Sequence, residues 1–210
     1  MNNAIKTAIA LPISIALGIS ANSANAASLT YAETVESYTQ GEFTYDDPGK
    51  IATRTNVNNA LGAPEDDASD NFLALGFGGE AVFSFGEMFS KQVKVWETTL
   101  GGFSSQSEYD EQVEVFVGND LENWLSIGVI ENIADEAYIG GATLNIGNDN
   151  QYQFVRLLDL SPVSEGRDGF DINAIAVNTG MESVPEPTSI LGLLTVGALG
   201  ASSLLKRKQR

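Results

Sequence analysis

The sequence predicts an all-β body, folded as an antiparallel β-sandwich or barrel, between two terminal segments that direct the chain to a membrane. Short apolar stretches recur through residues 27–183, and turn residues separate them. Helical patterns do not alternate with these stretches, which argues against parallel strands joined by helices. The length of 210 residues fits one domain with two tails.

The individual elements follow from the alternation of apolar and polar residues. In residues 111–117, Val113, Val115 and Val117 fall on one face, as in a half-buried strand. Residues 152–160 are apolar on both faces, which predicts a central strand. Glycine and Asn/Asp pairs between the stretches supply the positive φ angles of tight turns. The predicted elements are, in order, a short helix or turn at 56–61 and strands at 80–85, 91–97, 111–117, 152–160 and 170–177.

The N-terminal segment has the order of a secretory signal peptide. Lys6 precedes an apolar run over residues 8–19, and small residues follow up to Ala24-Asn25-Ala26. The run is short for a membrane span of about 20 residues. We therefore expect residues 1–26 to engage the secretion machinery, and signal peptidase to recognise Ala24 and Ala26.

The C-terminal segment has three parts in a fixed order. Pro185, Glu186 and Pro187 precede the uncharged residues 188–205, and the basic residues 206–210 end the chain. Eighteen helical residues span roughly 27 Å, which suffices for a thin hydrocarbon core. We expect a transmembrane helix over 188–205 in the inner membrane, with the basic tail on the cytoplasmic side.

This order of motif, apolar span and basic tail over residues 184–210 resembles the PEP-CTERM sorting signal. The resemblance implies that a membrane protease-transpeptidase, exosortase, cuts near the Pro-Glu-Pro motif. It also implies a bacterium that makes extracellular polysaccharide, which becomes an expected partner. The body would then lie outside the cytoplasm, at the cell surface, in the extracellular space or anchored to the membrane.

Composition excludes several classes of function. Residues 27–185 carry six basic and 27 acidic side chains, a net charge of -21. Such a body repels phosphate backbones, so nucleic-acid binding is not expected. The chain contains no cysteine and no histidine, which removes disulfides, thiolate metal sites and a Ser-His-Asp triad.

A second resemblance covers most of the body, residues 59–177. The segments that carry it are 59–65, 72–85, 93–97, 113–120 with Trp124, 154–157 and 169–175. In this order they resemble exported bacterial relatives of the discoidin-like, galactose-binding-type domain, which implies a jelly-roll-type sandwich. Such folds often hold a structural calcium ion where an early loop meets the last strand.

By this resemblance, Glu65, Asp66 and Asp171 would converge on a calcium ion, an oxygen-ligated cation. Relatives carry Asp at the position of Glu65 and a second acid at the position of Asn173. A solvated acidic loop without metal is the alternative interpretation of Glu65 and Asp66.

Aromatic residues in polar or glycine-rich surroundings are candidates for stacking on sugar rings. Tyr45, Phe103 and Tyr109 fit this description and would form an exposed platform. An ordinary, partly buried aromatic side chain is the alternative at each of these positions.

These observations together predict an exported, non-enzymatic protein of the cell surface or extracellular matrix that binds polysaccharide weakly. No spacing singles out a catalytic pair among the 28 acidic residues. The alternatives are a secreted carbohydrate-active enzyme and a purely structural matrix protein.

Overall fold

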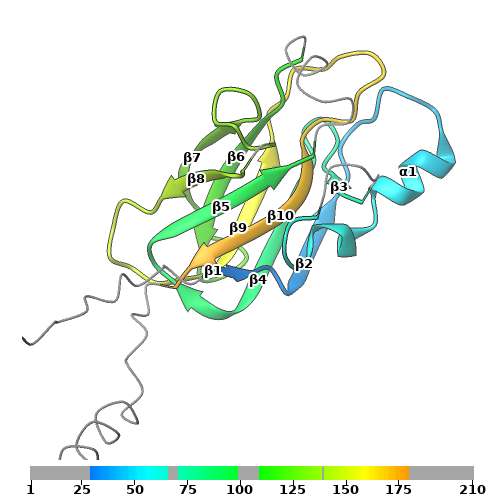
Figure 1. The fold of residues 1–210 in the computed structure, drawn as a ribbon. Helices are drawn as coiled ribbons and strands as arrows, with labels where there is room; N and C mark the ends of the chain where they lie inside the picture. The colour runs from blue at the N-terminus through cyan, green and yellow to red at the C-terminus, as the bar shows by residue number, and fades with distance from the viewer. Residues whose placement is uncertain (1–28, 66–70, 99–108, 139, 180–210) are drawn as a thin grey trace, which may run out of the picture.

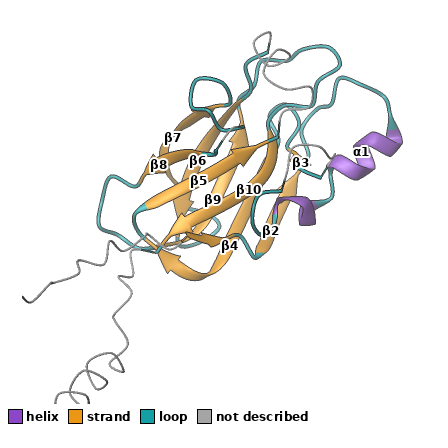
Figure 2. Ribbon diagram, viewed as in Figure 1, coloured by secondary structure: helices purple, strands orange, loops and turns teal. Residues whose placement is uncertain are grey.

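The computed structural model describes residues 29–65, 71–98, 109–138 and 140–179, and these form a two-layer β-sandwich (Figures 1 and 2). The all-β prediction is confirmed. The elements are β1 Leu29–Tyr31, β2 Thr34–Thr39, α1 Pro48–Arg54, the 3₁₀ helix η1 Val57–Ala60, β3 Leu73–Ala74, β4 Glu80–Phe89, β5 Gln92–Glu97, β6 Gln112–Gly118, β7 Leu125–Glu131, β8 Ala142–Asn145, β9 Tyr152–Asp159 and β10 Asp171–Asn178.

Two five-stranded sheets make up the sandwich. One has the order β1-β10-β5-β8, with β3 paired to the start of β10, and the other has the order β2-β4-β9-β6-β7. Every strand pair is antiparallel. The structure thus selects the sandwich over the barrel.

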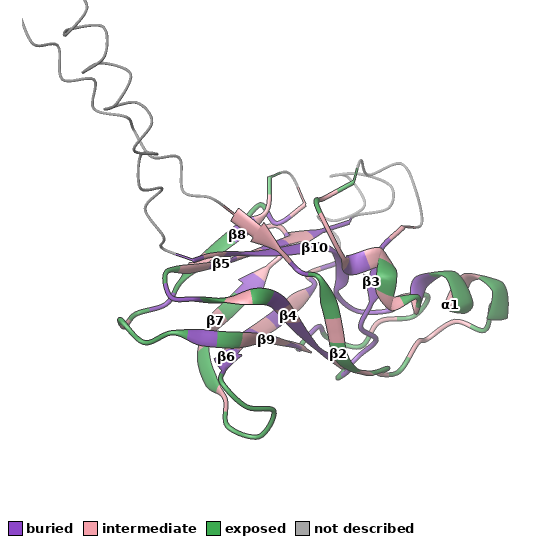
Figure 3. Ribbon diagram, turned by 90° about the horizontal axis from the view of Figure 1, so that it is seen from below, coloured by how far each residue is buried: buried purple, intermediate pink, exposed green. Residues whose placement is uncertain are grey.

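The core consists of the inward residues of the alternating strands. Val93 and Val95 of β5 are fully buried in one cluster with Val113, Val115 and Val117 of β6. Figure 3 marks the buried residues along the strands of both sheets in purple. Each such side chain contributes roughly 1.5–3 kcal/mol of transfer free energy, so the core can hold the fold without disulfides. The largest fully buried aromatic residues are Phe72, Phe83, Phe85, Phe89 and Phe170.

The outer face of the first sheet is covered by aromatic rings. Ala174 and Ala176 of β10 point away from the core, yet both are fully buried. Tyr31 and Trp96 flank them in the neighbouring strands, and their ring centroids lie 5.9 Å apart. Small residues in the central strand therefore make room for two rings above it.

The two ends of the sandwich differ in what they carry. Leu29 of β1 pairs with Asn178 of β10, so the described chain begins and ends at one end (Figure 1). The opposite end holds α1, η1 and the connections that precede β3, β6 and β10. We call it the loop end and define it by residues 40–65, 75–79, 109–111, 132–138 and 160–170.

The terminal segments lie outside the described residues. This applies to the signal peptide over 1–26 and to the sorting segment over 184–210. Among the described helices, none is long and apolar enough to cross a membrane. The helix expected over 188–205 therefore stays a prediction.

Candidate functional site

A polar hollow of about 220 Å³ opens at the loop end of the sandwich. We call it the loop-end pocket. It lies where α1, the start of β10 and the segments beside β5 and β6 meet. Its lining residues are Lys50, Arg54, Thr98, Glu111, Gly166, Arg167, Asp168 and Asp171.

Four carboxyl side chains are buried at or beside this pocket. Glu97 ends β5, Asp171 begins β10, Glu111 directly precedes β6, and Asp168 lies in the turn before β10. Their exposed fractions are 1%, 5%, 4% and 4%, respectively. The register between β5 and β10 pairs Glu97 with Ile172, which places Glu97 next to Asp171. Carboxylates are rarely buried to this extent without compensating charges.

The sequence pattern contains a signal for two of these acids that the predictions did not use. Glu97 continues the inward row of Val93 and Val95, and Glu111 stands two residues before Val113 in the inward row of β6. Alternation carried one step further places both carboxyl groups inward. No comparable pattern marks Asp168, because its position depends on a loop.

Arg54 is the cation that α1 brings into the cluster. Asp47 caps the helix by accepting hydrogen bonds from the main-chain N atoms of Gly49 and Lys50, each at 3.1 Å. The last residue of the helix, Arg54, is 4% exposed, and its Nη1 lies 2.6 Å from Asp168 Oδ2. Arg54 therefore compensates the charge of Asp168.

The other carboxyl groups are not compensated to the same degree. Burial raises the pKa of Glu111, and the charges of Asp171 and Glu97 and a hydrogen bond with Glu97 raise it further. Burial also raises the pKa of Asp171, with Asp168 and Glu97 adding to the effect, while Arg54 offsets part of it. Within the described residues, Asp171 Oδ1 is buried without a hydrogen-bond partner. The Asp171 carboxyl group thus retains an acceptor that the described donors do not satisfy.

Two of the predicted stacking residues reach this end of the molecule, but each ring is covered by a cation. Lys50 Nζ lies 4.3 Å from the ring centroid of Tyr45, and the Arg167 guanidinium lies 4.9 Å from that of Tyr109. Tyr109 is only 7% exposed, so its ring lies beneath the surface rather than on it. Tyr45 is half-buried, and burial together with its hydrogen bond to Asp168 raises its pKa. Phe103 lies outside the described residues, and its stacking role stays a prediction.

The three residues predicted to hold calcium are only partly covered by the described structure. Asp66 lies outside the described residues, the Glu65 carboxylate accepts a hydrogen bond from Asn71, and Asp171 lines the loop-end pocket. Within the described ranges, no group of three or more acidic side chains is arranged to hold a metal ion. The described acids therefore do not by themselves fit a calcium site, and we derive no step through the ion.

An amide makes the connection between the early loop and the last strand. Asn173 Oδ1 accepts a hydrogen bond from Glu65 N at 2.8 Å, and Asn173 Nδ2 donates to Glu65 O at 3.1 Å. The same Nδ2 donates to Thr98 Oγ1 at 2.7 Å. Asn173 thereby joins β10 both to the loop at Glu65 and to the residue that follows β5.

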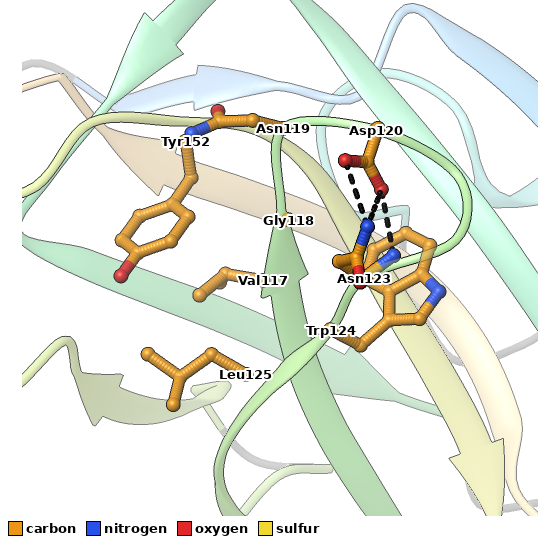
Figure 4. Close-up of a pocket in the computed structure, with 8 residues that line it drawn as sticks. All are labelled: Val117, Gly118, Asn119, Asp120, Asn123, Trp124, Leu125 and Tyr152. Atoms are coloured by element: carbon orange, nitrogen blue, oxygen red, sulfur yellow. Dashed lines mark hydrogen bonds between the residues drawn. The ribbon is translucent and has the colours of Figure 1, made fainter.

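A second, shallower hollow of about 320 Å³ lies between the end of β6 and the start of β7. Figure 4 shows Trp124 and Asn123 on one side of Gly118, with Tyr152 on the other. Asp120 Oδ1 accepts a hydrogen bond from Asn123 N at 2.6 Å. Because these polar groups already bond one another, this hollow is a weaker candidate than the loop-end pocket. Its lining residues are Val117, Gly118, Asn119, Asp120, Asn123, Trp124, Leu125 and Tyr152.

The processing residues cannot be placed relative to either hollow. Ala24 and Ala26 lie outside the described residues, as do Pro185, Glu186 and Pro187. Their roles as cleavage and sorting residues rest on the sequence.

Comparison with solved structures gives matches at low sequence identity, each with a TM-score below 0.5. A family 32 carbohydrate-binding module of AlyQ, in complex with 4,5-unsaturated mannuronic acid, is 12% identical over 70% of this chain and 96% of its own, with a TM-score of 0.40. The C-terminal domain of a chitobiase from Bacteroides fragilis is 12% identical over 69% of this chain and 91% of its own, with a TM-score of 0.42. A pectin-binding carbohydrate-binding module is 16% identical over 75% of this chain and 93% of its own, with a TM-score of 0.43.

Comparison of the sequence with curated proteins and family models gives one match. No curated protein matches the chain. Residues 183–208 match the family model described as the PEP-CTERM protein-sorting motif. This match confirms the sorting signal that the C-terminal sequence predicts, and it indicates an exported protein.

Proposed function

We propose that this chain is an exported, non-enzymatic surface protein whose β-sandwich binds polysaccharide through the loop-end pocket. The observation that carries the proposal is Asp171 Oδ1, a buried acceptor in a polar hollow without a partner among the described residues. Such an atom costs free energy in the unliganded protein, because it has lost water and gained nothing. A ligand that donates a hydrogen bond there recovers that cost.

The chemistry of the lining favours a polyhydroxylated ligand. The pocket offers carboxyl acceptors on Asp168 and Asp171 beside the basic groups of Lys50 and Arg167. A sugar hydroxyl both donates and accepts, so a vicinal pair can bridge neighbouring groups of this kind. An apolar ligand would leave them unsatisfied.

The arrangement of the acids supports binding rather than hydrolysis. Glu97 and Glu111 form a hydrogen bond with each other, whereas glycoside hydrolysis uses carboxyl groups separated by roughly 5–9.5 Å. The two competing functions are a secreted carbohydrate-active enzyme and a purely structural matrix protein.

Processing at both ends completes the proposal. Signal peptidase would cut after Ala26, and exosortase would act at the motif of residues 185–187, with the helix over 188–205 in the inner membrane. The intact mass of the mature protein, isolated from its native cells, reports both cleavage points and any attached group. A mass that retains residues 1–26 would contradict export through a cleaved signal.

The binding proposal is tested by applying the mature protein and its Asp171→Asn variant to an array of polysaccharides and oligosaccharides. We expect binding that the variant loses. Absence of binding to every glycan on the array would favour a purely structural matrix protein. Hydrolysis of a labelled polysaccharide that is abolished by substitution of a single acidic residue would favour a carbohydrate-active enzyme.

The calcium ion at Glu65, Asp66 and Asp171 is a separate proposal. Because an ion that binds only the folded state stabilises it, added calcium should raise the melting temperature and a chelator should lower it. A melting temperature that changes neither with added calcium nor with a chelator would rule out the calcium proposal.

A further inference from the structure

The loop-end pocket contains more carboxyl groups than buried basic side chains to compensate them. Glu97, Glu111, Asp168 and Asp171 are each at most 5% exposed, and Arg54 is the basic side chain buried to the same degree among the described residues. Arg54 is engaged with Asp168 at 2.6 Å. The remaining carboxyl groups therefore face one another across a low-dielectric region, where repulsion is strong.

Neighbouring hydroxyl donors are already committed to other acceptors. Burial and the charge of Asp168 raise the pKa of both Tyr38 and Tyr45. The hydroxyl of Tyr38 donates to Ala74 O at 2.8 Å. The hydroxyl of Tyr45 donates to Asp168 Oδ2 at 2.7 Å. Neither hydroxyl is bonded to Asp171 Oδ1, which lines the hollow.

The remaining cations of the pocket lie at its rim, over aromatic rings. Lys50 Nζ is 4.3 Å from the ring centroid of Tyr45, and the Arg167 guanidinium is 4.9 Å from that of Tyr109. Both side chains are partly exposed, so water screens their charges more than it screens the buried acids. They line the pocket without donating a hydrogen bond to Asp171 Oδ1.

We propose that the loop-end pocket binds a primary ammonium group, carried by an amino-sugar residue with a free amine. The inference rests on the proposed function, because it specifies which polysaccharide the same pocket recognises. An ammonium group brings one positive charge and three N–H donors to a site where Asp171 Oδ1 lacks a hydrogen-bond partner among the described residues. A neutral hydroxyl brings one donor and no charge, and a uronic acid brings a further negative charge.

The size of the pocket agrees with an organic cation. Its volume of about 220 Å³ is several times the roughly 30 Å³ that one water molecule occupies. An amine attached to a pyranose ring fills such a space better than a bare ion does.

The test measures binding of three oligosaccharides of equal length and linkage, made of glucosamine, N-acetylglucosamine or glucose. The mature protein is titrated calorimetrically at physiological ionic strength, which weakens diffuse attraction to the acidic surface, and in the presence of a chelator. We expect the glucosamine oligomer to bind at least tenfold more tightly than the other two.

Two variants separate the pocket from the general acidity of the body. Asp171→Asn should weaken glucosamine binding at least tenfold, since it removes a carboxyl group whose ionised form a bound ammonium group stabilises, while keeping the shape. Asp149→Asn is the matched control, because the Asp149 side chain is fully exposed. It lies in the turn between β8 and β9, at the end of the sandwich opposite the loop-end pocket. This variant should bind like the unaltered protein, and melting curves confirm that both variants are folded.

Each other outcome has a defined meaning. Equal binding of the three oligomers would overturn the ammonium inference but not polysaccharide binding. Absence of binding to every glycan would overturn both the ammonium inference and the proposed polysaccharide binding. Glucosamine binding that survives Asp171→Asn would show diffuse charge attraction and overturn the inference. A lysine-rich peptide that binds the pocket as tightly as the oligomer would reassign the site to a protein partner.

Discussion

Among single residues, Asp159 does most to hold the loop end together. Its carboxylate accepts hydrogen bonds from the main-chain N atoms of Gly78 at 3.1 Å, Ser161 at 3.2 Å and Phe170 at 2.8 Å, and from Ser161 Oγ at 2.7 Å. Gly169 has a φ of +74°, and a Cβ there would lie 2.8 Å from Asp159 Oδ2. One buried side chain thus fixes three segments that have no sheet partner of their own.

Asp159→Ala should destabilise the protein by about 3 kcal/mol, since it leaves the buried main-chain donors of Ser161 and Phe170 and the part-buried donor of Gly78 without an acceptor. Urea denaturation followed by circular dichroism measures the change. Asp149→Ala removes an exposed acid and should change the free energy of unfolding by less than about 0.5 kcal/mol. Equal effects of the two substitutions would contradict the role of Asp159.

Asn173→Asp tests the amide that joins the early loop to β10. The aspartate keeps an acceptor for Glu65 N, but it loses the donations to Glu65 O and Thr98 Oγ1 and adds a charge near Asp171. We expect a loss of about 2–3 kcal/mol in the free energy of unfolding without added metal. A variant that is as stable as the original in a chelator would show that the amide donations contribute little.

For whole elements, the sequence was informative where a strand has one apolar face. The five predicted strands correspond to β4, β5, β6, β9 and β10, and the turn at residues 56–61 contains η1. The apolar pattern does not predict the strands β2, β7 and β8, because they lie at sheet edges and most of their residues are exposed or half-exposed. β1 has only three residues, which carry no period that can be recognised.

The residues of the candidate site likewise differ in whether the sequence pattern predicts their position. Inward acids such as Glu97 and Glu111 follow from strand alternation, whereas Asp168 and Arg54 come from a loop and a seven-residue helix. Their meeting is a long-range contact across 114 positions of the chain. No local pattern contains that information.

The turn between β6 and β7 depends on a glycine. A Cβ on Gly118 would lie 2.8 Å from Asn123 O and 2.9 Å from Trp124 Cε3. Gly118→Ala should therefore shift the Trp124 ring, change the tryptophan emission spectrum and cost about 1–3 kcal/mol of stability. Gly147→Ala, where a Cβ meets nothing within 4 Å, should alter neither quantity, and an unchanged Gly118→Ala spectrum would contradict the packing.

For the molecule as a whole, buried carboxyl groups link stability to pH. The pKa values of Glu111 and Asp171 are raised by burial and by neighbouring acids. A carboxyl group with a higher pKa in the folded than in the unfolded chain binds its proton more tightly when folded. Its contribution is complete below the ordinary pKa of about 4 and is lost as the pH rises toward the folded value.

The melting temperature should therefore fall between pH 5 and pH 8, and Glu111→Gln should flatten that dependence and raise the melting temperature at pH 8. Calorimetric melting curves at several pH values measure both effects. Glu122→Gln, a substitution on the exposed surface, should leave the slope nearly unchanged. A stability that rises with pH in the unaltered protein would contradict the raised pKa values of Glu111 and Asp171.

The pairing of Leu29 with Asn178 has a consequence for crowded layers of this protein. If each copy is held by its C-terminus, its neighbours press against the flanks of the sandwich, and the far end is left uncovered. Each pocket would then remain accessible as the density of copies increases. More pockets would bind the same polymer chain at once, so the polymer would dissociate much more slowly from a dense layer.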